Sequence, residues 1–313
     1  MSRRARWSAL WTGVLVSAAT VTLAQQVLYG GNEWLQFPSA NTGWLVAVGQ
    51  ETGAVTLIGR PAGVDRISGL AFDAAGTLWA ATLTGSESGT VRTSTLIQID
   101  PIDGALLDTI GPIVDGAGGP PIAIESLAFQ PGTGNLFGSR GIADLAGHQG
   151  ELYRIDTATG VASLVGDTNF RLAMIAFAPD GRLYQSASNS TNIPPTNSQL
   201  QILDPATGAV LSSVPTARFF KALAFRDDGV LFGASPQNNQ TTDTCDVYII
   251  EPATGVLHFL GDTGNNPIGS LAFGQATSPC VPQDPRCFAP RIRVVRPGEE
   301  SHPVPRVVVR PDP

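Results

Sequence analysis

Side chains of the types used in catalysis are scarce in this 313-residue sequence. Of its three histidines, His148 falls in a polar stretch, His258 alternates with apolar residues and His302 lies close to the C-terminus. No Gly-x-Ser-x-Gly, His-Glu-x-x-His or phosphate-binding glycine motif occurs, so nothing indicates a serine hydrolase, a zinc peptidase or a nucleotide-binding enzyme. His148 is therefore the one histidine to consider as a ligand or a general base.

The three cysteines indicate a structural rather than a catalytic role. Cys280 and Cys287 enclose six residues, two of them prolines, close to the C-terminus. In an oxidising compartment we expect a local disulfide between them, which would stabilise the fold by about 2–3 kcal/mol. Cys245 belongs to a different part of the chain, and we expect it to lie outside this disulfide.

The N-terminus has the pattern of a secretory signal. Residues 2–6 are basic, and an uncharged, mostly apolar run from Trp7 to Leu23 ends in small or neutral residues before Gln25. We expect removal of residues 1–24, which would place the mature protein in the periplasm, at the cell surface or in the medium, without membrane insertion. The alternative is an uncleaved anchor, for which a run of about 17 residues is short.

Composition excludes several classes of protein. Charged residues make up 14% of the chain, against about 25% in typical soluble proteins, and there are 35 glycines and 24 prolines. A chain so rich in turn formers, yet 42% hydrophobic, is neither a helical bundle nor disordered, and it favours an all-β fold. Residues 25–275 carry ten basic and 22 acidic side chains, so no nucleic-acid partner is expected.

A repeat then supplies the scaffold that must position any site. The pattern Leu/Ile-Ala-Phe recurs at 70–72, 127–129, 175–177, 223–225 and 271–273, at intervals of 57, 48, 48 and 48 residues. Each of the first four Leu/Ile-Ala-Phe segments is followed by a turn, a short apolar strand, a polar loop, a strand ending in an acid and a final strand. Four short strands in about 48 residues are typical of a β-propeller blade, whereas solenoid repeats are usually shorter.

The two ends of the repeat region complete one another. The fifth unit stops after residues 271–274, and its missing three strands match residues 27–31, 44–48 and 55–59. The sequence therefore predicts an all-β, five-bladed β-propeller over residues 25–275, whose last blade is closed by N-terminal strands plus one C-terminal strand. Such closure leaves no open sheet edge at the seam.

Loop lengths indicate which face carries a site. The turns between the first and second strands and between the third and fourth strands are tight, and their acids (Asp100, Asp156, Asp204 and Glu251) are expected to cap backbone amides. The opposite face carries long loops at 32–43, 83–95, 139–150, 187–198 and 235–246, which are rich in Ser, Thr, Asn and Gly. A ligand site is expected on this long-loop face, over the central channel.

Residues just ahead of each Leu/Ile-Ala-Phe should surround the channel mouth. The position two residues before the Leu/Ile of each repeat is occupied by small or apolar residues, Ser68 among them, except in two repeats. These two carry Glu125 and Lys221, and Lys221 is the only lysine of the chain. With Arg66 and Arg171, four positions ahead in their repeats, they form a candidate site for an anionic or polyhydroxylated ligand. The alternative is an ion pair with no ligand role. Aromatic side chains that could stack on a sugar, or pack beneath their own loops, are Trp34, Phe37, Phe170 and Phe219.

Two stretches carry a family resemblance, residues 152–160 (LYRIDTATG) and 175–184 (IAFAPDGRLY). They resemble repeats of secreted bacterial propellers of the NHL and YVTN type, and the similarity spans residues 27–275. That group includes binding proteins as well as lactonases and lyases. In gluconolactonase-like members, a glutamate ahead of the equivalent strand ligates a divalent cation, and Glu125 is the matching position. The five-blade count departs from the six blades of those enzymes.

Two functions remain open from the sequence. The first is a non-catalytic, monomeric binding module that uses the long-loop face for a glycan, another polymer, a peptide or a protein and needs no cofactor. The second is a metal-dependent hydrolase or lyase with a cation, Ca²⁺ for example, at Glu125. The scarcity of catalytic residues favours the first. Residues 276–313 form a Pro- and Arg-rich tail, interpreted as disordered or, alternatively, as a segment that adds a strand to a partner or attaches to an acidic surface.

Overall fold

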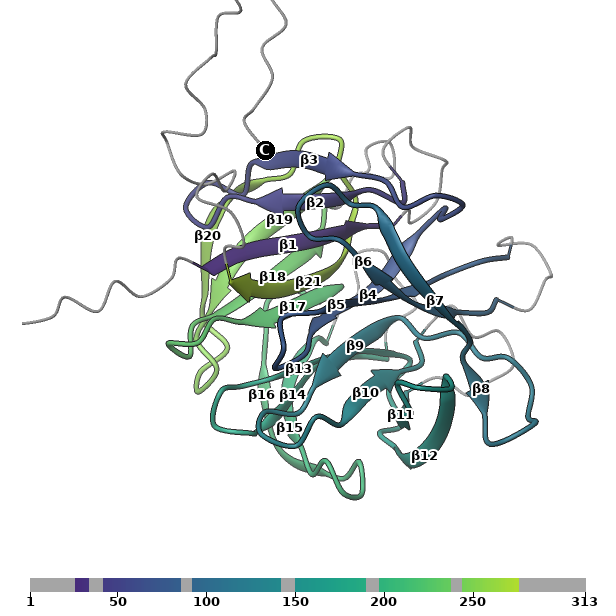
Figure 1. Ribbon diagram of the computed structural model, residues 1–313. Helices are drawn as coiled ribbons and strands as arrows, with labels where there is room; N and C mark the ends of the chain where they lie inside the picture. Colours follow the sequence, from purple (N-terminus) through teal and green to yellow (C-terminus); the bar gives the residue numbers. More distant parts are fainter. Residues whose placement is uncertain are drawn as a thin grey trace, which may run out of the picture.

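The computed structural model describes residues 26–33, 42–85, 92–141, 150–189, 197–237 and 244–275 (Figure 1). The expected signal segment 1–24, the expected Cys280–Cys287 disulfide and the tail 276–313 lie outside these residues, as do the middle parts of the long loops. Within the described ranges, no helix is long and apolar enough to cross a membrane.

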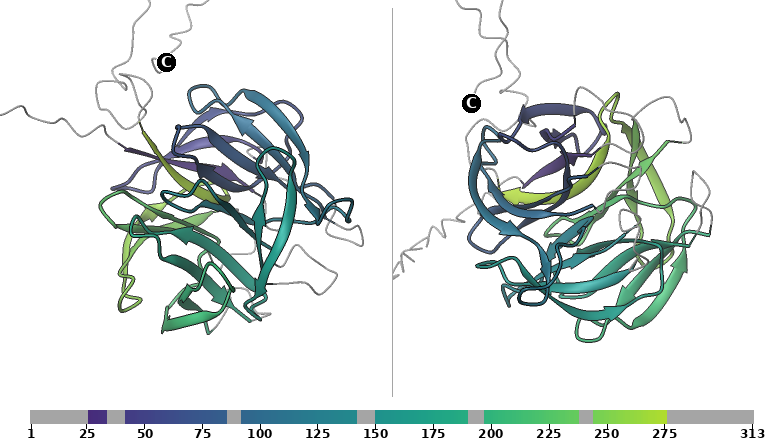
Figure 2. Two further views of the ribbon diagram at one scale, coloured as in Figure 1. Left: turned by 60° about the horizontal axis from the view of Figure 1, so that its bottom comes forward. Right: turned by 90° about the vertical axis from the view of Figure 1, so that its right-hand side faces the viewer.

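The described residues form five β-sheets, each with four antiparallel strands, arranged as the blades of a propeller, as Figures 1 and 2 show from three directions. Their inner strands contact one another in the ring order β4, β9, β13, β17, β21 and back to β4. From inner to outer strand, blade one consists of β4 (Ile67–Phe72), β5 (Leu78–Thr82), β6 (Thr95–Ile99) and β7 (Leu106–Pro112), and blade two of β9 (Ser126–Phe129), β10 (Leu136–Ser139), β11 (Glu151–Ile155) and β12 (Val161–Asp167). Blade three consists of β13 (Leu172–Phe177), β14 (Leu183–Ser188), β15 (Gln199–Leu203) and β16 (Val210–Pro215), and blade four of β17 (Ala222–Phe225), β18 (Leu231–Pro236), β19 (Cys245–Ile250) and β20 (Leu257–Asp262). Blade five consists of β21 (Ile268–Gln275), β1 (Gln26–Asn32), β2 (Leu45–Val48) and β3 (Val55–Gly59).

Blade five confirms the predicted closure, because its sheet has the order β21-β1-β2-β3. The N-terminal strand pairs with the last Leu-Ala-Phe segment in a register that sets Leu28 opposite Phe273 and Tyr29 opposite Ala272. In Figure 2 the purple N-terminal strand accordingly lies beside the yellow-green C-terminal one. The ring is thus sealed by hydrogen bonds between the two ends of the propeller region.

Aromatic pairs join each blade to the next. In each blade, an aromatic residue follows the first Leu of the second strand from the centre. Its ring packs against the Phe of the next blade's Leu/Ile-Ala-Phe, with ring centroids 5.0–6.2 Å apart. A pair of this kind contributes about 0.5–1.5 kcal/mol beyond the area it buries. The five pairs are Tyr29–Phe72, Trp79–Phe129, Phe137–Phe177, Tyr184–Phe225 and Phe232–Phe273.

The acids of the tight turns serve the backbone. The carboxylates of Asp100, Asp156 and Asp204 accept hydrogen bonds from the backbone N–H two residues later, at 2.7–2.9 Å. The glycine that closes such a turn has positive φ, 75° at Gly160 and 73° at Gly208, a conformation that residues with a Cβ rarely adopt. The predicted capping role therefore has its hydrogen bonds for these three acids, whereas the Glu251 carboxylate accepts from the Thr254 hydroxyl at 3.0 Å and lies 2.8 Å from the His258 Nε2.

Two details differ from the expectation. The link between blades one and two contains a short extra strand, β8 (Val114–Asp115), which pairs in parallel with β12 and gives blade two a fifth strand. The repeat predicts four strands per blade, and the hydrogen bond from the Tyr153 hydroxyl to Asp115 holds this additional strand against blade two. Cys245, placed in a long loop by the sequence, instead begins β19 and is buried, with its thiol donating to the Ile268 carbonyl at 3.7 Å.

Candidate functional site

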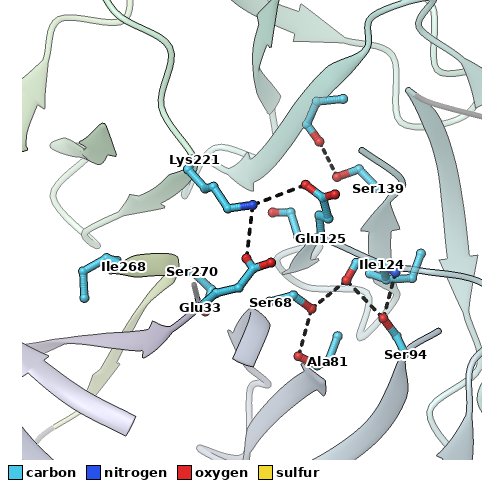
Figure 3. Close-up of polar contacts among 12 residues, drawn as sticks. Glu33, Ser68, Ala81, Ser94, Ile124, Glu125, Ser139, Lys221, Ile268 and Ser270 are labelled. Atoms are coloured by element: carbon cyan, nitrogen blue, oxygen red, sulfur yellow. Dashed lines mark hydrogen bonds and ion pairs between the residues drawn. The ribbon is translucent and has the colours of Figure 1, made fainter. Parts of the chain in front are cut away.

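Three charged side chains meet at the centre of the ring on the long-loop face (Figure 3). The Lys221 Nζ lies 3.1 Å from the Glu33 Oε2 and 3.4 Å from the Glu125 Oε2. All three residues are buried, with exposed fractions of 6% for Lys221, 3% for Glu33 and 1% for Glu125. We call these residues the ion triad.

The triad draws its members from three blades. Glu125 immediately precedes β9 of blade two, Lys221 immediately precedes β17 of blade four, and Glu33 immediately follows β1 of blade five. Each therefore sits at the end of a strand whose hydrogen bonds fix the direction of the side chain. Because blades two and four are not neighbours in the ring, the Glu125–Lys221 pair bridges the central channel.

Two glycines leave the space that the carboxylates fill. A Cβ on Gly269 would lie 2.3 Å from the Cβ of Glu33, and a Cβ on Gly141 would lie 2.6 Å from the Oε2 of Glu125. Contacts this short are not tolerated between real atoms, so any side chain at either position would displace a triad carboxylate. The triad geometry thus depends on two residues that carry no functional group.

Burial and mutual charge set the electrostatics of the triad. Burial raises the pKa of the Glu33 carboxyl above its ordinary value of 4.5; Lys221 and Arg66 oppose this rise, and Glu125 adds to it. Burial acts to lower the pKa of Lys221, but the carboxylates of Glu125 and Glu33 outweigh it and raise that pKa above its ordinary value of 10.5. Lys221 therefore stays charged at neutral pH, and its ammonium faces the side-chain carboxyl groups of both Glu33 and Glu125.

Buried hydroxyl groups hold the strand ends around the triad (Figure 3). The Ser68 Oγ donates to the Ile124 carbonyl at 2.7 Å and is also 3.1 Å from the Ala81 carbonyl. The Ser94 Oγ accepts from the Ile124 N–H at 2.8 Å. Ser68 belongs to blade one and Ile124 precedes the inner strand of blade two, so these bonds fix the backbone next to Glu125.

The structure brings together only some of the residues that the sequence nominated. Glu125 and Lys221 are in contact as an ion pair, and Ser68 is part of its buried surroundings, without touching either charge in the contacts above. Arg66 donates to the Gly85 carbonyl at 2.9 Å and acts on Glu33 through its charge. The backbone N–H of Arg171 donates to the Asn189 side chain at 2.8 Å.

The nominated aromatic residues have different outcomes. The Phe219 side chain is 4% exposed and packs with Leu172 and Met174, so it presents no open ring face in this structure. Phe170 is half-buried. Trp34, Phe37 and His148 lie outside the described residues, and their proposed roles stay predictions.

Sequence reasoning missed Glu33, because it falls within residues 32–43, which the sequence predicts to be a loop. A comparison of the repeats could have found it. Glu33 stands five residues after Leu28 in its second strand, where the other four repeats have Leu83, Gly141, Ser188 and Pro236. A charged residue at a position where other repeats have small or apolar residues is the same sign that singled out Glu125 and Lys221.

Comparisons with known proteins add a likeness of fold. No protein-family model matches the chain, and no curated protein does. Among solved structures, the chain is similar to a protein of unknown function from Bacteroides caccae, with 12% identity, a TM-score of 0.47 and coverage of 81% of this chain and 100% of that one. It is also similar to the periplasmic gluconolactonase of Pseudomonas aeruginosa, with 12% identity, a TM-score of 0.43 and coverage of 79% and 99%.

A third similar structure is the hydrazine synthase of Kuenenia stuttgartiensis, with 16% identity and a TM-score of 0.41. That match covers 70% of this chain and 60% of the other. At these identities and scores the comparisons carry no argument about activity. The chain is a five-bladed β-propeller by its own sheet topology, and the specific resemblance to NHL and YVTN repeats stays a prediction.

Proposed function

We propose that this protein is an extracytoplasmic binding propeller that takes a hydroxyl-rich or acidic glycan on its long-loop face, above the ion triad. The observation that carries the proposal is the gathering of Glu33, Glu125 and Lys221, the charges that interrupt the repeat, at the centre of this face. The strands and turns that all blades share do not need charges at these positions, so a built group of charges there favours a role in recognition. The signal-like residues 1–24 support an extracytoplasmic location.

In this proposal the triad forms the base of the site and other residues contact the ligand. The triad is too buried to offer its charges freely, but it fixes the strand ends from which the loops leave. Arg66 and Arg171 lie in the links between blades, and both are partly exposed. Arginine recognises carboxylates and sulfates through paired hydrogen bonds, which suits an acidic glycan better than a neutral one.

The test is a glycan array probed with the full chain and with the double variant Arg66→Ser/Arg171→Ser. The matched control is Arg154→Ser/Arg182→Ser, which removes the same charge from positions away from the channel mouth. We expect binding to an acidic glycan that weakens about tenfold or more in the first variant and not in the second. Absence of any glycan bound by the full chain, or equal loss in both variants, would refute the proposal.

A metal-dependent hydrolase or lyase with a cation at Glu125 is the second candidate. The favourable observation is that a second carboxylate, Glu33, approaches the same point. Against it, the Lys221 ammonium already lies within 3.1–3.4 Å of both carboxyl groups, so a cation would have to displace it. Within the described residues, no group of three or more His, Cys, Asp or Glu side chains could hold a metal ion.

A further inference from the structure

We propose that the groove between blades three and four binds a segment of the same chain, residues 288–297 of the C-terminal tail. The groove is open, with a volume of about 660 Å³, and both blades line it. It opens at the tight turns, opposite the ion triad, so this proposal stands independently of the function proposed above. We call it the interblade groove.

The groove combines an aromatic and aliphatic wall with an acidic rim. The rings of Tyr184 and Phe225 meet in it with centroids 5.0 Å apart, and Ile202 and Val214 extend the apolar wall. Along the rim lie the exposed carboxylates of Asp180, Asp227 and Asp228. Such a surface suits a peptide in which apolar and cationic side chains are interspersed.

The rim is not equally neutralised along its length. Asp180 pairs with Arg182 at 2.6 Å, and Asp228 pairs with Arg226 at 2.7 Å. The Asp227 carboxylate instead accepts a hydrogen bond from the neutral Gln275 amide at 3.3 Å. This corner of the groove therefore carries a surplus of negative charge, within a body of 22 acidic and ten basic side chains.

The last described residue before the tail, Gln275, lies at that same corner. Gln275 is the last residue of β21, and the Asp227 N–H also donates to the Gln26 side chain at 2.9 Å, so both ends of the propeller region meet the rim. Residues 276–287 can span up to about 40 Å when extended. Residues 288–297 can therefore reach a groove whose rim touches Gln275.

The segment matches the groove in chemistry. Residues 288–297 read FAPRIRVVRP, with three arginines, no acid, two prolines and four large apolar side chains. Arginines can pair with the rim carboxylates or lie over the aromatic rings, while the apolar side chains between them fill the wall. The next residues, 299 and 300, are both glutamates and are excluded from the proposed segment by their charge.

Limited trypsin digestion of the full chain, followed by mass spectrometry, tests the docking. The informative trypsin sites are those after Arg291, Arg293 and Arg306. Of the other tail arginines, Arg296 and Arg310 precede proline, and Arg286 lies beside Cys287. We expect cleavage after Arg291 and Arg293 to be about tenfold slower than after Arg306, as for a segment docked about 90% of the time. Equal rates at the three sites would overturn the proposal.

A charge-neutralised groove shows whether the groove causes the protection. The variant Asp180→Asn/Asp227→Asn/Asp228→Asn should lose the protection of Arg291 and Arg293. The control Asp100→Asn/Asp103→Asn/Asp156→Asn makes the same charge change on the tight turns of blades one and two and should retain it. Unfolding midpoints of both variants are measured alongside to show that both remain folded. The inference is contradicted if both variants lose the protection equally, or if both retain it.

Binding in trans identifies the occupant. A full chain carrying Arg291→Ser/Arg293→Ser/Arg296→Ser should bind a fluorescent peptide of residues 288–297, more weakly at high salt because the contact is ionic. Neutralising the groove aspartates in that chain should weaken binding about tenfold. Failure of the peptide to bind would overturn the assignment. So would tryptic protection of the unmodified chain that disappears on dilution, because the segment would then bind the groove of a second copy.

Discussion

The Lys221 ammonium lies 3.4 Å from the Glu125 Oε2, although the two residues belong to blades that are not neighbours in the ring. Every other link between blades described above joins adjacent sheets. The Glu125–Lys221 pair instead crosses the channel, and Glu33 adds a third blade to the same contact. Charge interactions at this mouth therefore couple blades that hydrophobic packing leaves separate.

Replacing Lys221 with methionine should destabilise the protein strongly. The change keeps an aliphatic chain of similar length but leaves two buried carboxylates without a counter-charge, which typically costs about 3–5 kcal/mol. Urea unfolding measures the loss. Arg182→Met removes one partner of an exposed ion pair and should cost less than about 1 kcal/mol. Similar losses in the two variants would show that the triad is not held by charge.

Replacing Glu33 with glutamine should change how stability depends on pH. The folded-state pKa of Glu33 lies above 4.5, so the native state retains this proton to a higher pH than the unfolded state does. The stabilisation that this proton provides is complete below pH 4.5 and is lost as the pH rises through the folded-state pKa. Glu33→Gln has no proton to lose at this position, so its stability lacks this decline.

The stability of Glu33→Gln relative to the unmodified protein should therefore increase as the pH rises above 4.5 and through the folded-state pKa of Glu33. Unfolding free energies at several pH values check this, with the exposed Glu51→Gln as control. A difference that stays constant, or falls with rising pH, would mean that burial does not raise the Glu33 pKa.

Replacing Gly141 with alanine should cost about 1–3 kcal/mol, because its Cβ would lie 2.6 Å from the Glu125 Oε2. The same change in a Glu125→Ala background should cost clearly less, since the clashing carboxylate is gone. A double-mutant cycle from thermal or urea unfolding gives the coupling between the two sites. Additive effects would show that the destabilisation by the alanine does not come from its contact with the Glu125 carboxylate.

Deleting residues 25–32 should give an insoluble or protease-sensitive product. The deletion removes β1, which pairs with β21 on one side and β2 on the other, and exposes two strand edges at the seam. Solubility, protease resistance and the melting transition are the measurements. A soluble product with one cooperative transition would contradict the role of β1 in closing the ring.

Metal analysis of the purified full chain should find neither Ca²⁺ nor Zn²⁺ in a stoichiometric amount, because the Lys221 ammonium already occupies the space beside the carboxyl groups that a cation would need. A stoichiometric metal that disappears in Glu125→Gln would instead support the hydrolase or lyase candidate. The control is Glu51→Gln, which removes an exposed carboxylate away from the triad.

The sequence alone determined the architecture, because every unit repeats the same local pattern. Leu/Ile-Ala-Phe recurs in all five blades, and the glycine of each tight turn and the acid before the last strand recur in the first four, so one blade predicts the next. The unmatched ends then required closure between residues near 28 and 273, as the register of β1 and β21 confirms. Contacts that repeat can be inferred from a pattern.

Only the tertiary structure decided what happens at the centre of the ring. The sequence singled out Glu125 and Lys221 as exceptions to the repeat and offered an ion pair between them as one alternative, but it did not predict their burial or the third partner, Glu33. Which exceptions meet depends on the direction in which strand ends point across a closed ring, and on the space that Gly141 and Gly269 leave. These are properties of five blades assembled together, and no single repeat contains them.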